Sequence, residues 1–211
     1  MTLELRRITG QDVFDSYITE SVQRALALVN RLATRRAQGR AVDVSTSPAA
    51  AREALLDINE ALGLARQTGL DEAGVAAVGE VARQIRSALE ATIAGDHESA
   101  AHVLNTLMTR HHAVPLLRSR PSEAPVLRFH SEGAGPVDAW AGCAAAGVAV
   151  AIGLGHADRF GVCEAADCDQ VFFDSTRNAS RRFCGLPCQN RAKAAAYRAR
   201  GGSAKSEKEG G

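Results

Sequence analysis

Apolar residues recur at i, i+3, i+4 and i+7 in four segments of the first 110 residues. This spacing gives a helix one apolar face, so it predicts four amphipathic α-helices. The predicted helices cover residues 22–33, 48–69, 75–89 and 97–108. Ser47 and Asp96 are N-cap candidates for the second and fourth helices, and Pro48 suits a first helical position. This part of the chain is therefore predicted to be mainly helical.

The helical spacing stops at residues 118–135, where two prolines and two glycines interrupt the chain. Val126–His130 is a short β-prone run, which predicts a small strand or hairpin. Pro136 then begins an Ala/Gly-rich helix that is expected to end near Gly155. This segment is short and only weakly hydrophobic for a membrane span, so we expect a buried helix.

Four of the five cysteines lie between residues 163 and 188, in the order Cys163-x4-Cys168-x15-Cys184-x3-Cys188. Two close pairs separated by a spacer of this length can supply four ligands to one tetrahedral ion. Zinc suits four thiolates best, because it accepts tetrahedral geometry and undergoes no redox change. The spacing therefore predicts one structural Zn²⁺.

The residues around the cysteines predict a small zinc-stabilised module. Residues 169–173 are β-prone, residues 174–180 read as a turn, and residues 181–183 are expected to return as a second strand. The residues after Cys188 are strong helix formers. The resulting order is a cysteine knuckle (residues 163–168), a β-hairpin and a helix, which is the order of a treble-clef finger. A module of this size buries little core, so bound zinc would supply folding free energy of about 10–16 kcal/mol.

Other uses of four cysteines fit less well. A redox dithiol usually has Cys-x-x-Cys beside a βαβ unit, and an iron–sulfur site usually has ferredoxin spacing. A catalytic zinc keeps an open coordination position, and residues 157–211 contain no histidine to serve as base or ligand. We therefore expect no enzyme activity, and an enzyme ranks third among the functional hypotheses.

Charge is divided unevenly along the 211 residues. Residues 1–174 contain 16 basic and 22 acidic groups, a net charge of −6, whereas residues 175–200 contain seven basic groups and no acidic ones. A basic end on an acidic body suggests a polyanionic partner. The N-terminus lacks the apolar region of a signal peptide, so we expect a soluble cytoplasmic protein without a membrane partner.

The basic and amide side chains of this end are the candidate nucleic-acid contacts. They are Arg177, Asn178, Arg181, Arg182, Asn190, Arg191, Lys193, Arg198 and Arg200. Guanidinium groups suit phosphates and guanine edges, and amides can bind base edges. The same cations could instead pair with the acidic body, dock a protein, or only keep the module soluble. On a helical wheel, Ala192, Ala195, Ala196 and Ala199 form one stripe that could press against the zinc site.

These residues also resemble the CGNR zinc-finger family. The resemblance covers residues 161–200 and is carried by Phe172, Asp174, Arg177, Asn178, Ser180, Arg181, Arg182, Cys184, Cys188, Gln189, Asn190, Arg191 and Lys193. Gln189 stands where the family has glycine, and Phe183 where it often has tryptophan. The N-terminal part is similar to the ABATE-type domain that usually precedes this finger, with Asn30 in the best local match, ALALVNRL.

The resemblance implies a bacterial DNA-binding transcription regulator. Residues 1–156 would be an ABATE-like helical domain that senses a small molecule or stress. Asn30 lies on an apolar helix face and is expected first as a satisfied buried amide, with a ligand contact in a sensor pocket as the alternative. Residues 157–202 would be the zinc finger, and residues 203–211 a disordered tail. DNA is the expected partner, with a small-molecule effector and a homodimer as further expectations. The alternative is a zinc-stabilised RNA-binding or protein-interaction adaptor. Loss of zinc, as in Cys184→Ser, is expected to unfold only the C-terminal module.

Overall fold

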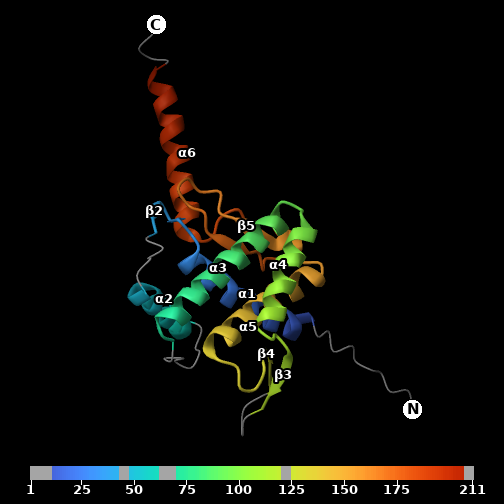
Figure 1. Cartoon of the computed structure of the whole chain (residues 1–211). Coiled ribbons are helices and arrows are strands. Elements are labelled where there is room, and N and C mark those ends of the chain that lie inside the picture. The colour runs from blue at the N-terminus through green and yellow to red at the C-terminus, as the bar shows by residue number, and fades with distance from the viewer. Residues whose placement is uncertain (1–10, 43–47, 62–69, 120–124, 207–211) are drawn as a thin grey trace, which may run out of the picture.

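The computed structural model describes residues 11–42, 48–61, 70–119 and 125–206, which form an α+β structure that is mostly helical with small antiparallel strand pairs (Figure 1). The helices are α1 (Gln11–Leu32), α2 (Pro48–Ala61), α3 (Glu72–Ile93), α4 (His97–Arg110), α5 (Pro136–Gly153) and α6 (Leu186–Ser206), with a 3-10 turn η1 (Ala157–Arg159). The strands are β1 (Arg36–Ala37), β2 (Arg40–Ala41), β3 (Pro115–Arg118), β4 (Val126–Phe129), β5 (Phe160–Val162) and β6 (Val171–Phe173). Helices α1 to α5 form a body, and α6 projects from it (Figure 1).

The predicted helices of the body are present. The Asp96 carboxylate accepts a hydrogen bond from the Ser99 backbone N–H at 3.0 Å, which confirms its N-cap role for α4. Pro48 and Pro136 are the first residues of α2 and α5. Ser47 and the expected end of the second helix, at residues 62–69, lie outside the described residues.

The β-prone run after residue 125 forms a strand, as predicted. Strand β4 pairs with β3 in antiparallel register, with Leu117 opposite Leu127. The described residues form three sheets, and each has only two strands. The sheets therefore serve as local hairpins, and the helices supply most of the core.

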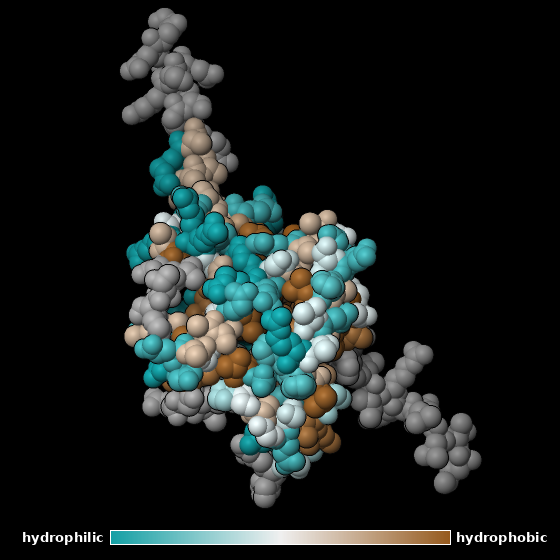
Figure 2. Space-filling view, viewed as in Figure 1, coloured by the Kyte–Doolittle hydropathy of each residue, from teal (hydrophilic) through white to brown (hydrophobic). Residues whose placement is uncertain are grey.

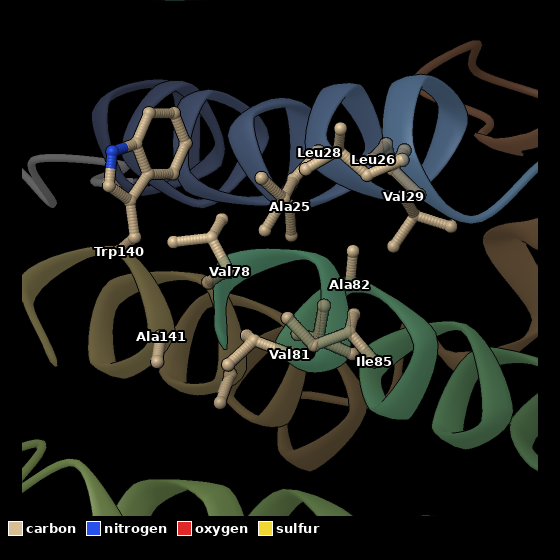
Figure 3. Close-up of a cluster of buried hydrophobic side chains, with 14 of the residues drawn as sticks. Ala25, Leu26, Leu28, Val29, Val78, Val81, Ala82, Ile85, Trp140 and Ala141 are labelled. Atoms are coloured by element: carbon tan, nitrogen blue, oxygen red, sulfur yellow. The ribbon is translucent and has the colours of Figure 1, made fainter. Parts of the chain in front are cut away.

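Helices α1, α3 and α5 pack their apolar faces together in the centre of the body (Figure 3). Small residues on α5 allow the close approach. A Cβ added to Gly147 would lie 2.9 Å from the Ser21 Cβ, and one added to Gly142 would lie 2.3 Å from the Phe129 carbonyl oxygen. The high alanine and low aromatic content thus reflects tight helix packing.

Among the described helices, α5 alone is long and apolar enough to cross a membrane. Half of it is buried against the other helices of the body, including α1, α3 and α4. A core helix of a soluble protein has these properties, which supports the expectation of a buried helix.

The partner of β6 differs from the prediction. Strand β6 pairs with β5, which precedes Cys163, and residues 181–183 do not form a strand. The backbone N–H of Arg181 instead donates to the Asp174 carboxylate at 2.6 Å. This bond folds the chain after β6 into a loop. Because β6 pairs with β5, the hairpin encloses the first cysteine pair rather than following it.

Helix α6 also differs from the prediction. Cys188 is buried and Ala192 is half-buried, but Ala195, Ala196 and Ala199 are exposed. The stripe points in the expected direction, yet α6 extends past the body after its second turn (Figure 1). The helix continues to Ser206, so residues 203–206 are helical where disorder was expected, and residues 207–211 lie outside the described part.

Candidate metal centre

The four predicted cysteines converge on one point. The sulfur atoms of Cys163, Cys168, Cys184 and Cys188 all lie within 4.8 Å of one another. The Sγ of Cys184 is 3.8 Å from that of Cys168 and 3.6 Å from that of Cys188. Four thiolates at about 2.3 Å from a tetrahedral zinc ion are separated by about 3.8 Å. The donor set and its spacing therefore fit one zinc ion.

Two ligands come from the loop of the β5–β6 hairpin, and two come from the start of α6. Cys163 and Cys168 lie in the loop between β5 and β6, where the Cys163 N–H donates to the Gln170 carbonyl at 2.9 Å. Cys184 precedes α6, and Cys188 lies in its first turn. Cys163, Cys168 and Cys188 are buried, so the site forms a small core of its own.

The pKa values of the clustered cysteines and the repulsion between their thiolates favour a bound cation. Burial raises the pKa of Cys184, and the neighbouring sulfurs raise it further. Burial is also the main cause of the raised pKa of Cys188. For Cys168, burial is outweighed by the N–H groups of Gln38 and Gln170, which donate to its sulfur and lower its pKa. Four thiolates this close repel one another unless a metal ion neutralises them.

The hairpin β1–β2 covers the first cysteine pair. Its two turn residues, Gln38 and Gly39, both have positive φ (52° and 87°), as a two-residue hairpin turn requires. The turn aims the Gln38 N–H at Cys168 and the Gly39 N–H at the Asp167 carbonyl, at 3.0 Å. A Cβ on Gly39 would lie 2.5 Å from the Arg191 guanidinium, so glycine suits both the turn and this contact.

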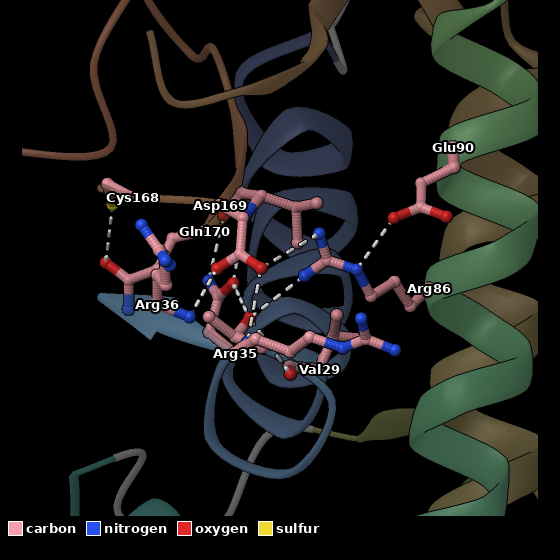
Figure 4. Close-up of polar contacts among 11 residues, drawn as sticks. Val29, Arg35, Arg36, Arg86, Glu90, Cys168, Asp169 and Gln170 are labelled. Carbon is pink, nitrogen blue, oxygen red and sulfur yellow. Dashed lines mark hydrogen bonds and ion pairs between the residues drawn. The ribbon is translucent and has the colours of Figure 1, made fainter. Parts of the chain in front are cut away.

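Asp169 joins the metal site to the helical body (Figure 4). Its carboxylate accepts from the Arg36 N–H at 2.8 Å and from the Arg35 N–H at 3.2 Å. Arg86 on α3 lies 3.8 Å from the same carboxylate and also donates to the Thr34 hydroxyl at 3.1 Å and to Glu90 at 2.8 Å. The loop that carries Cys168 is thereby tied to α3 and to residues 34–36, the segment that follows α1.

Asn30 is a structural residue in this arrangement. Its Nδ2 donates to the Val171 carbonyl at 2.8 Å, and its Oδ1 accepts from the Val171 N–H at 2.9 Å. Both ends of the amide are thus used by one residue of β6. The amide thereby pairs α1 with the strand that follows the cysteine knuckle, as expected for a satisfied amide, and a ligand contact of Asn30 stays a prediction.

Asp174 shapes the arginine-rich loop, residues 174–183. It is 2% exposed and accepts from the backbone N–H groups of Thr176, at 2.8 Å, and Arg181, at 2.6 Å. Burial acts to raise its pKa, but the Thr176 side chain and these two backbone N–H groups outweigh it and hold the pKa below the usual value. Arg159 closes the other side of the loop by donating to the carbonyls of Asp174 and Thr176.

Three of the candidate nucleic-acid contacts are engaged by the chain itself. Arg181 donates from Nε to the Phe183 carbonyl at 2.7 Å and from Nη2 to the Cys184 carbonyl, and it stacks on the Phe172 ring. Arg191 donates to the Ala166 carbonyl at 2.8 Å. Arg182 forms an exposed ion pair with Glu164, which raises the arginine pKa and lowers that of the glutamate.

Five of the remaining candidates face solvent. Arg177 and Asn178 are exposed at the tip of the loop, and Asn190, Lys193 and Arg198 are exposed on α6. Arg200 lies on α6, but its side chain is outside the described residues. The structure thus separates the arginines that hold the module together from those available to a partner.

The sequence did not predict the contacts between the N-terminal part and the loop that carries Cys168. Asp167, Asp169 and Gln38 are ordinary polar residues there, and their partners lie up to 134 residues away along the chain. One local signal was present, because Gln38-Gly39 between two Arg-Ala pairs suits a two-residue hairpin turn. Nothing in that signal identifies the knuckle as its partner.

The fold and the cysteine geometry can now be compared with known families. Residues 159–201 match the CGNR zinc finger family. The matched segment begins at the end of η1 and ends within α6, so it contains all four cysteines and the arginine-rich loop. No curated protein matches the chain significantly. The ABATE-type assignment of the N-terminal part stays a prediction.

Proposed function

We propose that this chain is a zinc-dependent DNA-binding protein that regulates transcription. The observation that carries the proposal is the projecting helix α6, which contains five basic residues and no acidic ones. Figure 2 shows hydrophilic side chains gathered around the base of α6, on the face in view. A positively charged helix that extends beyond the body of a protein suits a polyanion.

The shape of the module supports duplex DNA as the polyanion. The DNA major groove is about 12 Å wide and admits one α-helix. The exposed Ala194 helps to keep that helix slim. Arg177 in the neighbouring loop is exposed and can reach a phosphate while α6 lies in the groove.

The exposed cations do not neutralise the acidic body within the part of the chain that the structure describes. Arg177, Lys193 and Arg198 form no ion pair there, and Arg182 pairs with Glu164 of the same module. This favours an external partner over intramolecular docking. Surface ion pairs such as Arg182–Glu164 are weak, so a phosphate could replace Glu164 as the partner of Arg182.

The zinc centre would act as a structural support in this function. We interpret the knuckle followed by a helix with a ligand in its first turn as a treble-clef-like finger whose hairpin encloses the first cysteine pair. The helical body would be the sensor domain, and both would work in the cytoplasm, where reduced thiols favour zinc binding. The effector and the homodimer remain expectations of the family resemblance.

A mobility-shift titration of the zinc-loaded full chain tests the proposal. We expect binding to duplex DNA whose log K falls steeply with log salt, and Arg177→Ala should reduce the slope by about 1. Arg52→Ala, an exposed position on α2, should leave both affinity and slope unchanged. Absence of duplex binding would contradict the proposal. A preference for structured RNA or for a protein partner would favour the adaptor hypothesis instead.

A further inference from the structure

One face of α6 points directly away from the zinc site. At 100° per residue, the buried Cys188 marks the inward side of the helix. Asn190 and Tyr197 lie within about 20° of the opposite direction, and Lys193 lies within about 40°. Tyr197 is 74% exposed, and Asn190 and Lys193 are also exposed. We define these three residues as the outward face.

The outward face combines side chains that bind base edges. An amide can donate to and accept from the adenine N6 and N7 positions, and a lysine ammonium can donate to guanine O6 and N7. A tyrosine ring offers apolar surface for a thymine methyl group, and its hydroxyl can donate or accept. The body of the protein makes no use of these three side chains in hydrogen bonds or ion pairs within the described residues.

The spacing of the face matches stacked base pairs. Seven residues separate Asn190 from Tyr197, which is about 10.5 Å along the helix axis. Consecutive base pairs are about 3.4 Å apart, so this distance spans about three steps. Lys193 lies between the two and can reach an intermediate pair.

We propose that the outward face of α6 enters the major groove of duplex DNA and reads bases within about four consecutive base pairs through Asn190, Lys193 and Tyr197. The proposal rests on the proposed DNA binding and adds the surface that determines sequence preference. Arg198, at about 100° from Tyr197 on the helix, would lie beside the groove wall and contact a phosphate. Arg177 would contact the backbone from the loop.

Groove geometry favours DNA over duplex RNA as the occupant. The major groove of A-form RNA is deep and narrow, so side chains on a helix cannot read it. A protein partner for the exposed Tyr197 is opposed by the charge of α6, whose five cations have no acidic neighbour on the helix. RNA or protein binding is therefore an outcome of the test rather than part of the proposal.

The test begins with selection of preferred sites from a random duplex library by the zinc-loaded full chain. Fluorescence anisotropy then compares the selected duplex with a scrambled one. Asn190→Ala and Tyr197→Ala should each weaken binding to the selected duplex by about 10-fold or more, since one good base contact discriminates by 1–3 kcal/mol. Both variants should keep the binding of the scrambled duplex and the salt slope.

Two controls make the result specific. Ala195→Gln changes an exposed residue on the inward side of the same helix. It should alter neither the affinity for the selected duplex nor that for the scrambled duplex. Replacing guanine and adenine in the selected duplex by their 7-deaza analogues removes an acceptor found only in the major groove, and we expect it to weaken binding of the unaltered chain. Zinc content measured for each variant shows that the module is intact.

The outcomes separate this inference from the proposed function. If the unaltered chain binds no duplex, or binds a protein or structured RNA instead, both proposals fail. If it binds duplex DNA with a steep salt dependence, but the outward-face variants and the deaza duplexes behave as the controls do, only the major-groove reading face is overturned. Absence of any selected sequence has the same consequence.

Discussion

Arg177 and Arg181 lie four residues apart in one loop and have opposite surroundings. Arg181 donates to two carbonyls at the start of the second cysteine pair and stacks on Phe172 at 5.1 Å from the ring centroid. Arg177 is exposed at the tip of the loop. The guanidinium of Arg181 thus fixes the backbone next to Cys184, and that of Arg177 is exposed without an ion pair in the described part of the chain. Both arginines belong to the motif that resembles the CGNR family, and only the folded chain distinguishes their surroundings.

Arg181→Lys should destabilise the zinc-loaded protein. A lysine ammonium cannot reproduce the planar fork that reaches Phe183 and Cys184 while stacking on Phe172. We expect the free energy of unfolding to fall by about 1–3 kcal/mol, measured by urea denaturation. The matched control is Arg177→Lys, which keeps the charge at the exposed position and should leave stability unchanged. Equal stability of the two variants would contradict the structural role of Arg181.

At the level of elements, β6 is held on two sides. It pairs with β5 on one edge, and the amide of Asn30 satisfies the backbone of Val171 on the other. This second contact replaces a third strand with one side chain of α1. The cysteine knuckle between β5 and β6 is therefore positioned by a helix that lies more than 100 residues earlier in the chain.

Asn30→Ala should loosen this strand. The variant leaves the N–H and C=O of Val171 without their partners in a part-buried setting, which costs about 1–3 kcal/mol. We expect a lower melting temperature and a weaker affinity for zinc, the latter measured by competition with a chromophoric chelator. Gln23→Ala removes an exposed side chain of the same helix and should change neither. An unaltered zinc affinity in Asn30→Ala would show that the strand position does not depend on this amide.

Across the whole molecule, the elements that follow local rules were predictable and the connections between distant segments were not. The helix spacing, the Asp96 cap and the four-cysteine pattern are local or chemically specific, and all three appear in the structure. The β5–β6 pairing was missed because Phe160–Val162 is too short to give a period-2 signal. The exposed alanines of α6 were misjudged, because a helical wheel gives direction and cannot show where the body ends.

The metal site and the helical body form one connected structure. Phe160 and Val171 belong to the same buried cluster as residues of α1, α3 and α5. Asp169, Gly39 and Asn30 add hydrogen bonds between the knuckle and the N-terminal part. These contacts argue against the expectation that loss of zinc unfolds only the C-terminal module.

Cys184→Ser should therefore destabilise the whole chain. Structural zinc contributes on the order of 10 kcal/mol to folding, and 1 kcal/mol shifts Tm by about 2–4 °C in a chain of this size. We expect zinc loss and a fall in Tm of at least ~10 °C in the helical circular dichroism signal, most of which comes from α1 to α5. The control is Cys143→Ser, because Cys143 is half-exposed on α5 and is not one of the four clustered cysteines. This variant should retain zinc and lose far less stability. A helical transition that keeps its Tm in Cys184→Ser would mean that the body folds independently of the metal. Because α1 contributes both to the central core and to the support of the knuckle, we expect the two to melt together.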